Sequence, residues 1–300
     1  AYQEFNFDQF LAEKLVGTPQ AINAYVECCE RHLGSNKIAL IWEGKNGESA
    51  EWTFEQLADA SGKLAHYFTS LGLKAGDCVA GLLPRTPELL ITILATWRMG
   101  AIYQPLFTAF ESKAIEHRIN TAKTRLIVTN EEQRPKLNSV DVLHILTVYQ
   151  PNTLSQQDDD FWTELIKQSS VFEPVMQTFK DDFLMMFTSG TTGLAKSVPV
   201  PLKAVLAFKG YMTYAVDLRA EDSFWNLADP GWAYGLYYGI TGPLSLGHSI
   251  IMDERAFSVD HAVQIIKKYK VSNLTGSPTA FRMFLKKKKK FDPSIKAHLR

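Results

Sequence analysis

A run of glycines and hydroxyl-bearing residues follows a short apolar segment in the middle of the chain. After residues 183–187 the sequence reads Thr188-Ser189-Gly190-Thr191-Thr192-Gly193-Leu194-Ala195-Lys196. Glycines allow a tight turn in which successive backbone amides converge on one anion, hydroxyls add donors, and the lysine supplies a positive charge. The segment therefore predicts a loop that binds the phosphates of a nucleoside triphosphate.

Two other interpretations fit the same residues. A polar turn without a ligand is one, since glycine and threonine are common in turns. A Walker A loop, G-x-x-x-x-G-K-[ST], is the other, and residues 190–197 would satisfy it if Ala195 were glycine. However, Pro199 and Pro201 push the residues before them into extended conformations, so the helix that a Walker lysine opens cannot start after Lys196.

A second candidate segment combines aromatic residues with glycines. Residues 229–239 carry Trp232, Tyr234, Tyr237 and Tyr238 among three glycines, just after a predicted strand. Such a composition suits an apolar wall of a ligand pocket. Core packing is the alternative, and it is stronger for Tyr237 and Tyr238 than for Trp232.

Basic and metal-binding patterns are less informative. Five lysines at 286–290 follow an apolar helical pattern, so the basic end of a helix explains them more simply than a nucleic-acid or membrane site. His117, His248 and His261 share no metal-ligand spacing. We therefore predict no metal site in the chain and no catalytic histidine.

The elements that would position these residues alternate between strands and helices. The first predicted series consists of strands at 77–83, 100–105 and 125–129 and helices at 87–99 and 111–121. The second consists of strands at 183–187, 223–227, 248–252 and 271–275 and a helix at 258–269. In this helix Ser258 can cap the free backbone amides of the first turn, and Val263, Ile266 and Tyr269 share one face. This alternation predicts largely parallel sheets, which bind ligands at the carboxyl ends of their strands.

Composition and local sequence features predict the domain organisation and the compartment. The polar stretch at 150–160 predicts a linker between an α/β subdomain at 51–160 and an incomplete one at 161–300, with a lead-in at 1–50. Thirty-two basic and thirty-two acidic residues cancel, which argues against nucleic acid as a partner. Cys28, Cys29 and Cys78 lack metal or disulfide spacing and predict buried thiols. Without a basic, apolar start or a membrane-length apolar run, we expect a cytoplasmic protein.

Several of these segments together resemble one family. Thr188 to Lys196 resembles the phosphate loop of the adenylate-forming superfamily of acyl-CoA synthetases, luciferases and peptide-synthetase adenylation domains. That family usually has Pro-Lys-Gly where Ala195-Lys196-Ser197 stand here. Further segments that resemble it lie at 52–57, 98–101, 227–232 and 276–280, and the last two look most like acetyl-CoA and medium-chain acyl-CoA synthetases.

The resemblance implies a fold and an activity. The fold would be the large N-terminal domain of an acyl-CoA synthetase, built from two α/β subdomains, without the small C-terminal domain. The activity would be an ATP-dependent, Mg²⁺-requiring ligase that forms acyl-AMP from a short or medium carboxylic acid and then acyl-CoA, releasing pyrophosphate and AMP. Family members continue beyond residue 300, so we expect a fragment. A nucleotide-binding fragment without catalysis and an adenylating enzyme that loads a carrier-protein thiol are the alternatives.

The resemblance also implies roles for individual residues. Thr188 and Lys196 are the catalytic candidates, and with residues 189–193 they would bind the ATP phosphates. Trp232 would form the acyl wall, and Tyr234 and Ser277 would approach the acyl group or CoA. Arg134 and Lys136 occupy a position that resembles a CoA-phosphate loop, although a solvated surface loop explains them equally well.

Overall fold

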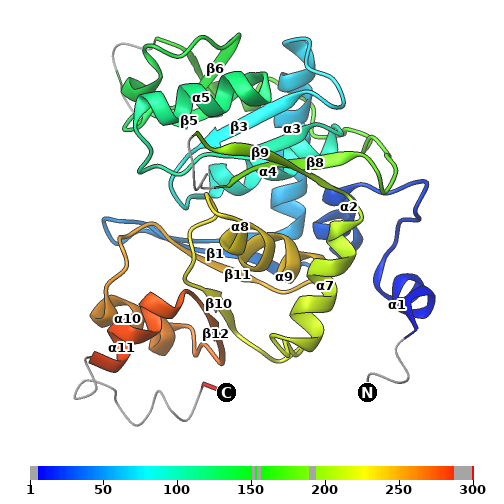
Figure 1. Cartoon of the computed structure of the whole chain (residues 1–300), viewed down its shortest axis with the longest axis vertical. Coiled ribbons are helices and arrows are strands. Elements are labelled where there is room, and N and C mark those ends of the chain that lie inside the picture. The colour runs from blue at the N-terminus through cyan, green and yellow to red at the C-terminus, as the bar shows by residue number, and fades with distance from the viewer. Residues whose placement is uncertain (1–5, 151–152, 154–156, 189–193, 287–298) are drawn as a thin grey trace.

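The computed structural model describes residues 6–150, 153, 157–188, 194–286 and 299–300. Three β-sheets stack along the long axis of the molecule, with helices between and around them (Figure 1). The largest has seven strands in the order β7-β6-β5-β3-β4-β8-β9. Its members are β3 (Cys78–Leu82), β4 (Ile102–Pro105), β5 (Thr124–Asn130), β6 (His144–Val148), β7 (Asp159–Asp160), β8 (Asp182–Thr188) and β9 (Lys196–Pro201).

Every neighbouring pair in this sheet is parallel except β8 and β9, which form an antiparallel hairpin. The predicted α/β class and largely parallel sheet are confirmed. The predicted strand at 100–105 begins only at Ile102, because Gly100 turns the chain with a positive φ of 73°. Strands from both sides of residue 160 share this one sheet. The subdomain boundary at residue 160 stays a prediction.

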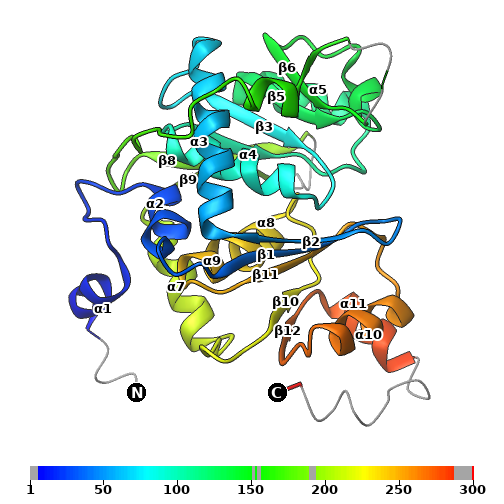
Figure 2. The ribbon, with the colours of Figure 1, turned by 180° about the vertical axis from the view of Figure 1, so that it is seen from behind.

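Helices connect the parallel strands and cover the sheet. The crossovers are α4 (Pro87–Arg98), which is buried along almost its whole length, and α5 (Ser112–Ala122). Helix α3 (Phe54–Ser70) packs along α4 and begins with a capping box between Thr53 and Gln56. It spans from the middle sheet to the seven-stranded sheet (Figure 2). Shorter segments are η1 (Glu30–His32), η2 (Arg134–Leu137) and α6 (Phe161–Leu165).

The middle sheet joins distant parts of the chain. It contains β1 (Ile38–Glu43), β2 (Ser49–Thr53) and β11 (Ile250–Asp253), with β1 antiparallel to β2 and parallel to β11. The surrounding helices are α1 (Phe7–Lys14), α2 (Ala24–Cys28), α7 (Ala204–Tyr214), α8 (Ala233–Leu236), η3 (Tyr237–Thr241) and α9 (Gly242–Ser245). Sequence reasoning predicted neither β1 nor β2 and treated residues 1–50 only as a lead-in.

The smallest sheet pairs β10 (Phe224–Asn226) with β12 (Asn273–Thr275) and carries α10 (Val259–Lys268) and α11 (Pro278–Lys286). The side chain of Ser258 accepts a hydrogen bond from the backbone of His261, as a helix cap should. The buried face of α10 is centred on Ala262, Ile265 and Ile266, whereas Val263 and Tyr269 are only partly buried. Of the predicted lysine run, Lys286 ends α11 and residues 287–290 lie outside the described part.

All three cysteines are free and buried, which confirms the expectation of buried thiols. Burial raises the pKa of Cys28 and of Cys78 to about 12, so both stay protonated at neutral pH. Among the described residues, no helix is both long and apolar enough to cross a membrane.

A fully buried ion pair joins the N-terminal segment to α7. The carboxylate of Glu27 lies 2.6 Å from Nζ of Lys209, and neither side chain is exposed. Arg31 donates to the same carboxylate at 2.7 Å, and the backbone N–H groups of Val16 and Gly17 donate at 2.8 Å each. Burial alone would raise the pKa of Glu27, but Lys209, Gly17 and Arg31 hold it below its ordinary value.

We expect Lys209→Met to lower the free energy of unfolding at pH 7 by about 3 to 5 kcal/mol, because it leaves Glu27 buried without its main partner. Denaturant unfolding measures this change. Since the pKa of Glu27 is lowered in the fold, the loss should shrink as the pH falls below the ordinary pKa of glutamate.

The matched control is Lys45→Met, because Lys45 pairs with Glu132 at 2.8 Å while both side chains are about half exposed. That change should cost less than about 1 kcal/mol. Equal losses in the two variants would contradict a structural role for the buried pair.

Candidate functional site

The hairpin of β8 and β9 frames the predicted phosphate loop. Thr188, the last residue of β8, pairs with Lys196, the first residue of β9, and both are exposed. The loop residues Ser189, Gly190, Thr191, Thr192 and Gly193 lie outside the described residues. Because β8 runs parallel to β4, the loop begins at the carboxyl edge of the sheet, where parallel sheets bind ligands.

Aromatic side chains from three segments meet beside this edge. The ring of Trp232 lies 5.6 Å from Phe107 and 5.7 Å from Phe110, which follow the carboxyl end of β4. The guanidinium of Arg118 on α5 lies 4.1 Å from the centre of the Phe110 ring and 5.6 Å from that of Phe187, next to Thr188. We call Phe107, Phe110, Phe187 and Trp232 the aromatic cluster. It brings the predicted acyl wall next to the phosphate-loop hairpin.

The backbone around Trp232 is tightly packed. A Cβ atom at Gly231 would lie 2.8 Å from the Cα of Phe107, and one at Gly235 would lie 2.2 Å from the carbonyl oxygen of Asp229. Only glycine fits these two positions without displacing backbone. The Asp229 carboxylate accepts a hydrogen bond from the Gly231 N–H at 2.8 Å and lies 4.0 Å from Arg85. Burial raises the pKa of Asp229, although Arg85 and Gly231 oppose the shift.

Tyr234 belongs to a stack of tyrosines that covers one end of α7. Its ring meets Tyr238 edge to face at 5.2 Å, and Tyr238 stacks on Tyr211 at 4.0 Å. Burial and a hydrogen bond with Tyr211 raise the pKa of Tyr234 to about 12. The hydroxyl is therefore neutral at physiological pH.

The remaining predicted residues lie apart from this cluster. Ser277 is exposed and its hydroxyl accepts from the N–H of Ala280, so it caps α11. Arg134 forms a two-pronged ion pair with Asp158, at 2.5 and 2.9 Å, and donates to Asn138. Nζ of Lys136 donates to the carbonyl of Thr108. An external phosphate would have to share or replace these contacts of Arg134 and Lys136.

A cavity of about 640 Å³ opens between the β1–β2 turn and the carboxyl ends of β3, β5 and β6. It contains none of the predicted site residues. Its walls include Trp42, Trp52 and the carboxylates of Glu48, Glu131 and Glu254. Because carboxylates repel phosphate oxygens, this cavity does not suit a nucleotide.

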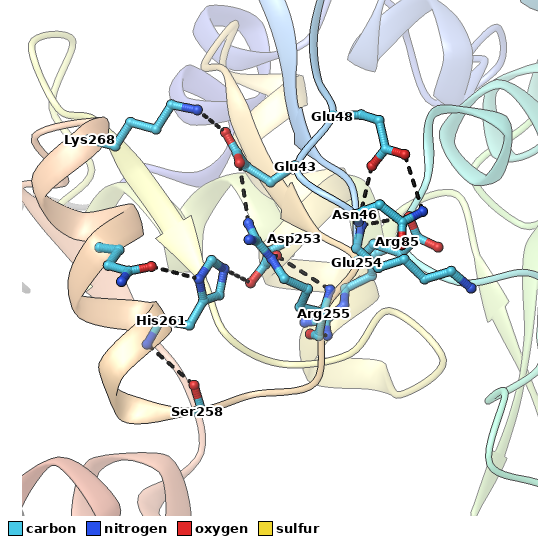
Figure 3. A network of polar contacts seen from close by, with 12 residues as sticks. Glu43, Asn46, Glu48, Arg85, Asp253, Glu254, Arg255, Ser258, His261 and Lys268 are labelled. Carbon is cyan, nitrogen blue, oxygen red and sulfur yellow. Dashed lines mark hydrogen bonds and ion pairs between the residues drawn. The ribbon is translucent and has the colours of Figure 1, made fainter.

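A neighbouring charge network ties the middle sheet to α10 (Figure 3). Glu43 on β1 accepts from Lys268 at 2.5 Å and from Arg255 at 3.2 Å. Asp253 on β11 contacts Arg255 at 3.1 Å and His261 at 2.9 Å. The carboxylates of Glu43 and Asp253 therefore already have ion-pair partners, and these pairs hold the middle sheet and α10 together. Within the described part of the chain, no cluster of histidine, cysteine, aspartate and glutamate could hold a metal ion.

Sequence reasoning missed Phe107, Phe110, Arg118 and Arg85. Phe107 and Phe110 follow a predicted strand, so their position after its carboxyl end was a usable signal. Arg118 and Arg85 gave no such signal, since Phe187 and Asp229, which they contact at the site, lie far from them in the sequence.

Comparisons with known proteins identify relatives over almost the whole chain. A sequence model of the family described as AMP-binding enzyme matches residues 28–300. Acetyl-coenzyme A synthetase from Cronobacter sakazakii is 30% identical over 291 residues, and that from Gemmatimonas aurantiaca is 32% identical over 296 residues. Each match covers 88% of this chain and 45% of the relative, so the chain spans less than half the length of these proteins.

A solved structure is similar over an even larger share of the chain. The crystal structure of Brucella canis acyl-CoA synthetase is 46% identical and superposes with a TM-score of 0.93. The match covers 99% of this chain and 55% of that one. The predicted resemblance to the N-terminal part of such enzymes is thus confirmed.

The contact between Asp229 and Gly231 allows a paired test of the aromatic segment. Asp229→Ala should cost about 1 kcal/mol in the free energy of unfolding, because the acceptor of the Gly231 N–H is lost. Asp229→Asn keeps an acceptor, and it removes a charge that the fold disfavours at neutral pH. It should therefore match or exceed the wild-type stability at pH 7.

Thermal unfolding from pH 7 downward measures both variants. The advantage of Asp229→Asn should shrink as the pH approaches the ordinary pKa of aspartate, since the wild-type side chain then becomes neutral in both states. Equal losses in the alanine and asparagine variants would contradict the role assigned to this hydrogen bond.

Proposed function

The chain belongs to the AMP-binding enzyme family, and from this premise we propose that the protein is an AMP-forming acid–thiol ligase for a short or medium carboxylic acid. In the first step, a carboxylate oxygen bonds to the α-phosphorus of ATP and pyrophosphate leaves. In the second, the CoA sulfur bonds to the acyl carbon and AMP leaves. The observation that carries the proposal is that Thr188 and Lys196 pair at the sheet edge beside which Trp232 packs on Phe107 and Phe110.

Each group at this edge suits one requirement of adenylation. Lys196 is exposed and free to neutralise charge on the β and γ phosphates, where negative charge develops as pyrophosphate leaves. The hydroxyl of Thr188 adds a donor opposite it. Trp232 is 42% exposed although it packs on Phe107 and Phe110, so one face of the indole can cover an acyl chain. Mg²⁺, bound together with ATP, would supply further neutralisation of the phosphate charge.

CoA is the acceptor that the relatives favour, since those that match are acetyl-CoA and acyl-CoA synthetases. We assign Tyr234 and Ser277 to the acyl or CoA side, and Arg134 and Lys136 to the CoA phosphates with the contacts described above. The free, buried cysteines support a cytoplasmic location.

The test is carboxylate-dependent exchange of labelled pyrophosphate into ATP by the full-length gene product, with acids from acetate to octanoate. Exchange followed by thioester formation with CoA is the expected result. Exchange without CoA thioester would indicate another acceptor, such as a carrier-protein thiol. Absence of exchange with every acid, in a folded protein, would favour nucleotide binding without catalysis.

Lys196→Ala should raise the KM for MgATP or lower the exchange rate by about tenfold to a hundredfold, because a charge-assisted phosphate contact of about 1.5 to 3 kcal/mol is lost. Lys203→Ala is the control, since Lys203 is an exposed lysine that follows the far end of the same strand. Unchanged kinetics in Lys196→Ala would refute the phosphate role.

Trp232→Ala should shift the preference toward longer acids. Removing the indole opens space beside Phe107 and Phe110, and each methylene that enters an apolar pocket contributes about 1 to 3 kcal/mol. The ratio of kcat/KM for octanoate to that for acetate measures the shift. Trp162→Ala, which removes a half-buried indole stacked on Trp52 far from the hairpin, should leave the ratio unchanged. A ratio that moves equally in both variants would contradict the assignment.

A further inference from the structure

Helix α5 contacts both arms of the phosphate-loop hairpin through two consecutive residues. On the outgoing arm, Nε2 of His117 lies 2.8 Å from the carbonyl oxygen of Ala195. On the incoming arm, Arg118 lies over the ring of Phe187, the residue before Thr188. The two contacts place one rigid element against both ends of the segment that Thr188 and Lys196 enclose.

The contact of His117 has a defined direction. A carbonyl oxygen can only accept, so Nε2 of His117 must carry the proton and donate. The bond joins residues 78 positions apart and is partly buried, so it is a tertiary constraint and not a local turn. Its strength in a partly desolvated position should be that of an ordinary hydrogen bond or slightly more.

The bond fixes the backbone from which Lys196 projects. The carbonyl of Ala195 and the N–H of Lys196 belong to one planar peptide unit, so holding the oxygen also orients that N–H. Ala195 has no ring to restrict its own φ, so the chain just before this peptide is less constrained than a proline would make it, and the hydrogen bond from His117 adds to the pairing of Lys196 with Thr188. A loop that is ordered in advance binds its ligand without paying that ordering cost at the moment of binding.

We propose that His117 is a positioning residue that holds the Ala195–Lys196 peptide in place, so that Lys196 meets the phosphates of ATP in one orientation. This proposal rests on the function proposed above, because it concerns the same loop. His117 does not touch substrate in this role. A purely structural link between α5 and β9 is the competing explanation, and it predicts a loss of stability alone.

Two substitutions separate these explanations. The amide of glutamine reaches about as far as Nε2 of histidine, whereas the amide of asparagine reaches only about as far as Nδ1. His117→Gln should therefore keep the donor near Ala195, and His117→Asn should lose it. Lys113→Asn controls for placing asparagine in α5, because Lys113 is exposed on the same helix.

The first readout is pyrophosphate exchange by the full-length protein. His117→Asn should raise the KM for MgATP by about threefold to tenfold, which is the value of one hydrogen bond, with little change in the KM for the acid. His117→Gln and Lys113→Asn should stay close to wild type. Equal KM values for MgATP in all four proteins, or a loss in His117→Gln as large as in His117→Asn, would overturn the proposal.

The second readout needs no activity. Amide hydrogen exchange at Lys196, without nucleotide, should be faster in His117→Asn than in wild type and restored in His117→Gln. An unchanged amide exchange rate at Lys196 in His117→Asn would overturn the proposal, even if the protein is active with ATP in the first readout. If wild type instead shows no pyrophosphate exchange, the proposed function fails, and the amide rates still report whether His117 holds this peptide.

Discussion

Strand β8 enters the seven-stranded sheet beside β4 and runs in the same direction, with Leu184 opposite Tyr103. The indole N–H of Trp97 donates to the carbonyl of Phe183 at 3.2 Å, which fixes β8 to the helix that precedes β4. Asn23 in turn donates to the carbonyl of Trp97 at 2.8 Å. This parallel pairing decides which edge carries the hairpin loop. Had β8 run the other way, Thr188 and Lys196 would lie at the opposite edge, away from Phe107 and Trp232.

Much of this arrangement could be predicted because the signals are local. The strand before Thr188, the extended segment after Lys196 and the Ser258 cap each follow from neighbouring residues, and the structure has all three. The placement of Trp232 against Phe107 could not be predicted in this way, since it depends on how distant segments pack. The β1–β11 pairing is of the same kind, because it joins residues about two hundred positions apart.

Carboxylates at the joints between elements show a common arrangement. Glu27 and Glu43 are both buried, and in both cases burial alone would raise the pKa while several donors hold it down. Each therefore stays charged and links elements from different parts of the chain. Neither was a candidate in the sequence, because an isolated glutamate gives no pattern until its lysine and arginine partners are brought to it. Asp229 differs, since its nearest cation lies 4.0 Å away and its pKa is raised.

Strand β9 forms one edge of the seven-stranded sheet, and it carries Pro199 and Pro201 among its six residues. Proline has no N–H to offer a further strand, so this edge is a poor template for pairing with another chain. The opposite edge, β7, has only two residues. A sheet whose core strands are strongly apolar is thereby protected from edge-to-edge aggregation at both sides. The sequence that keeps the chain after Lys196 extended thus also contributes to the colloidal stability of the protein.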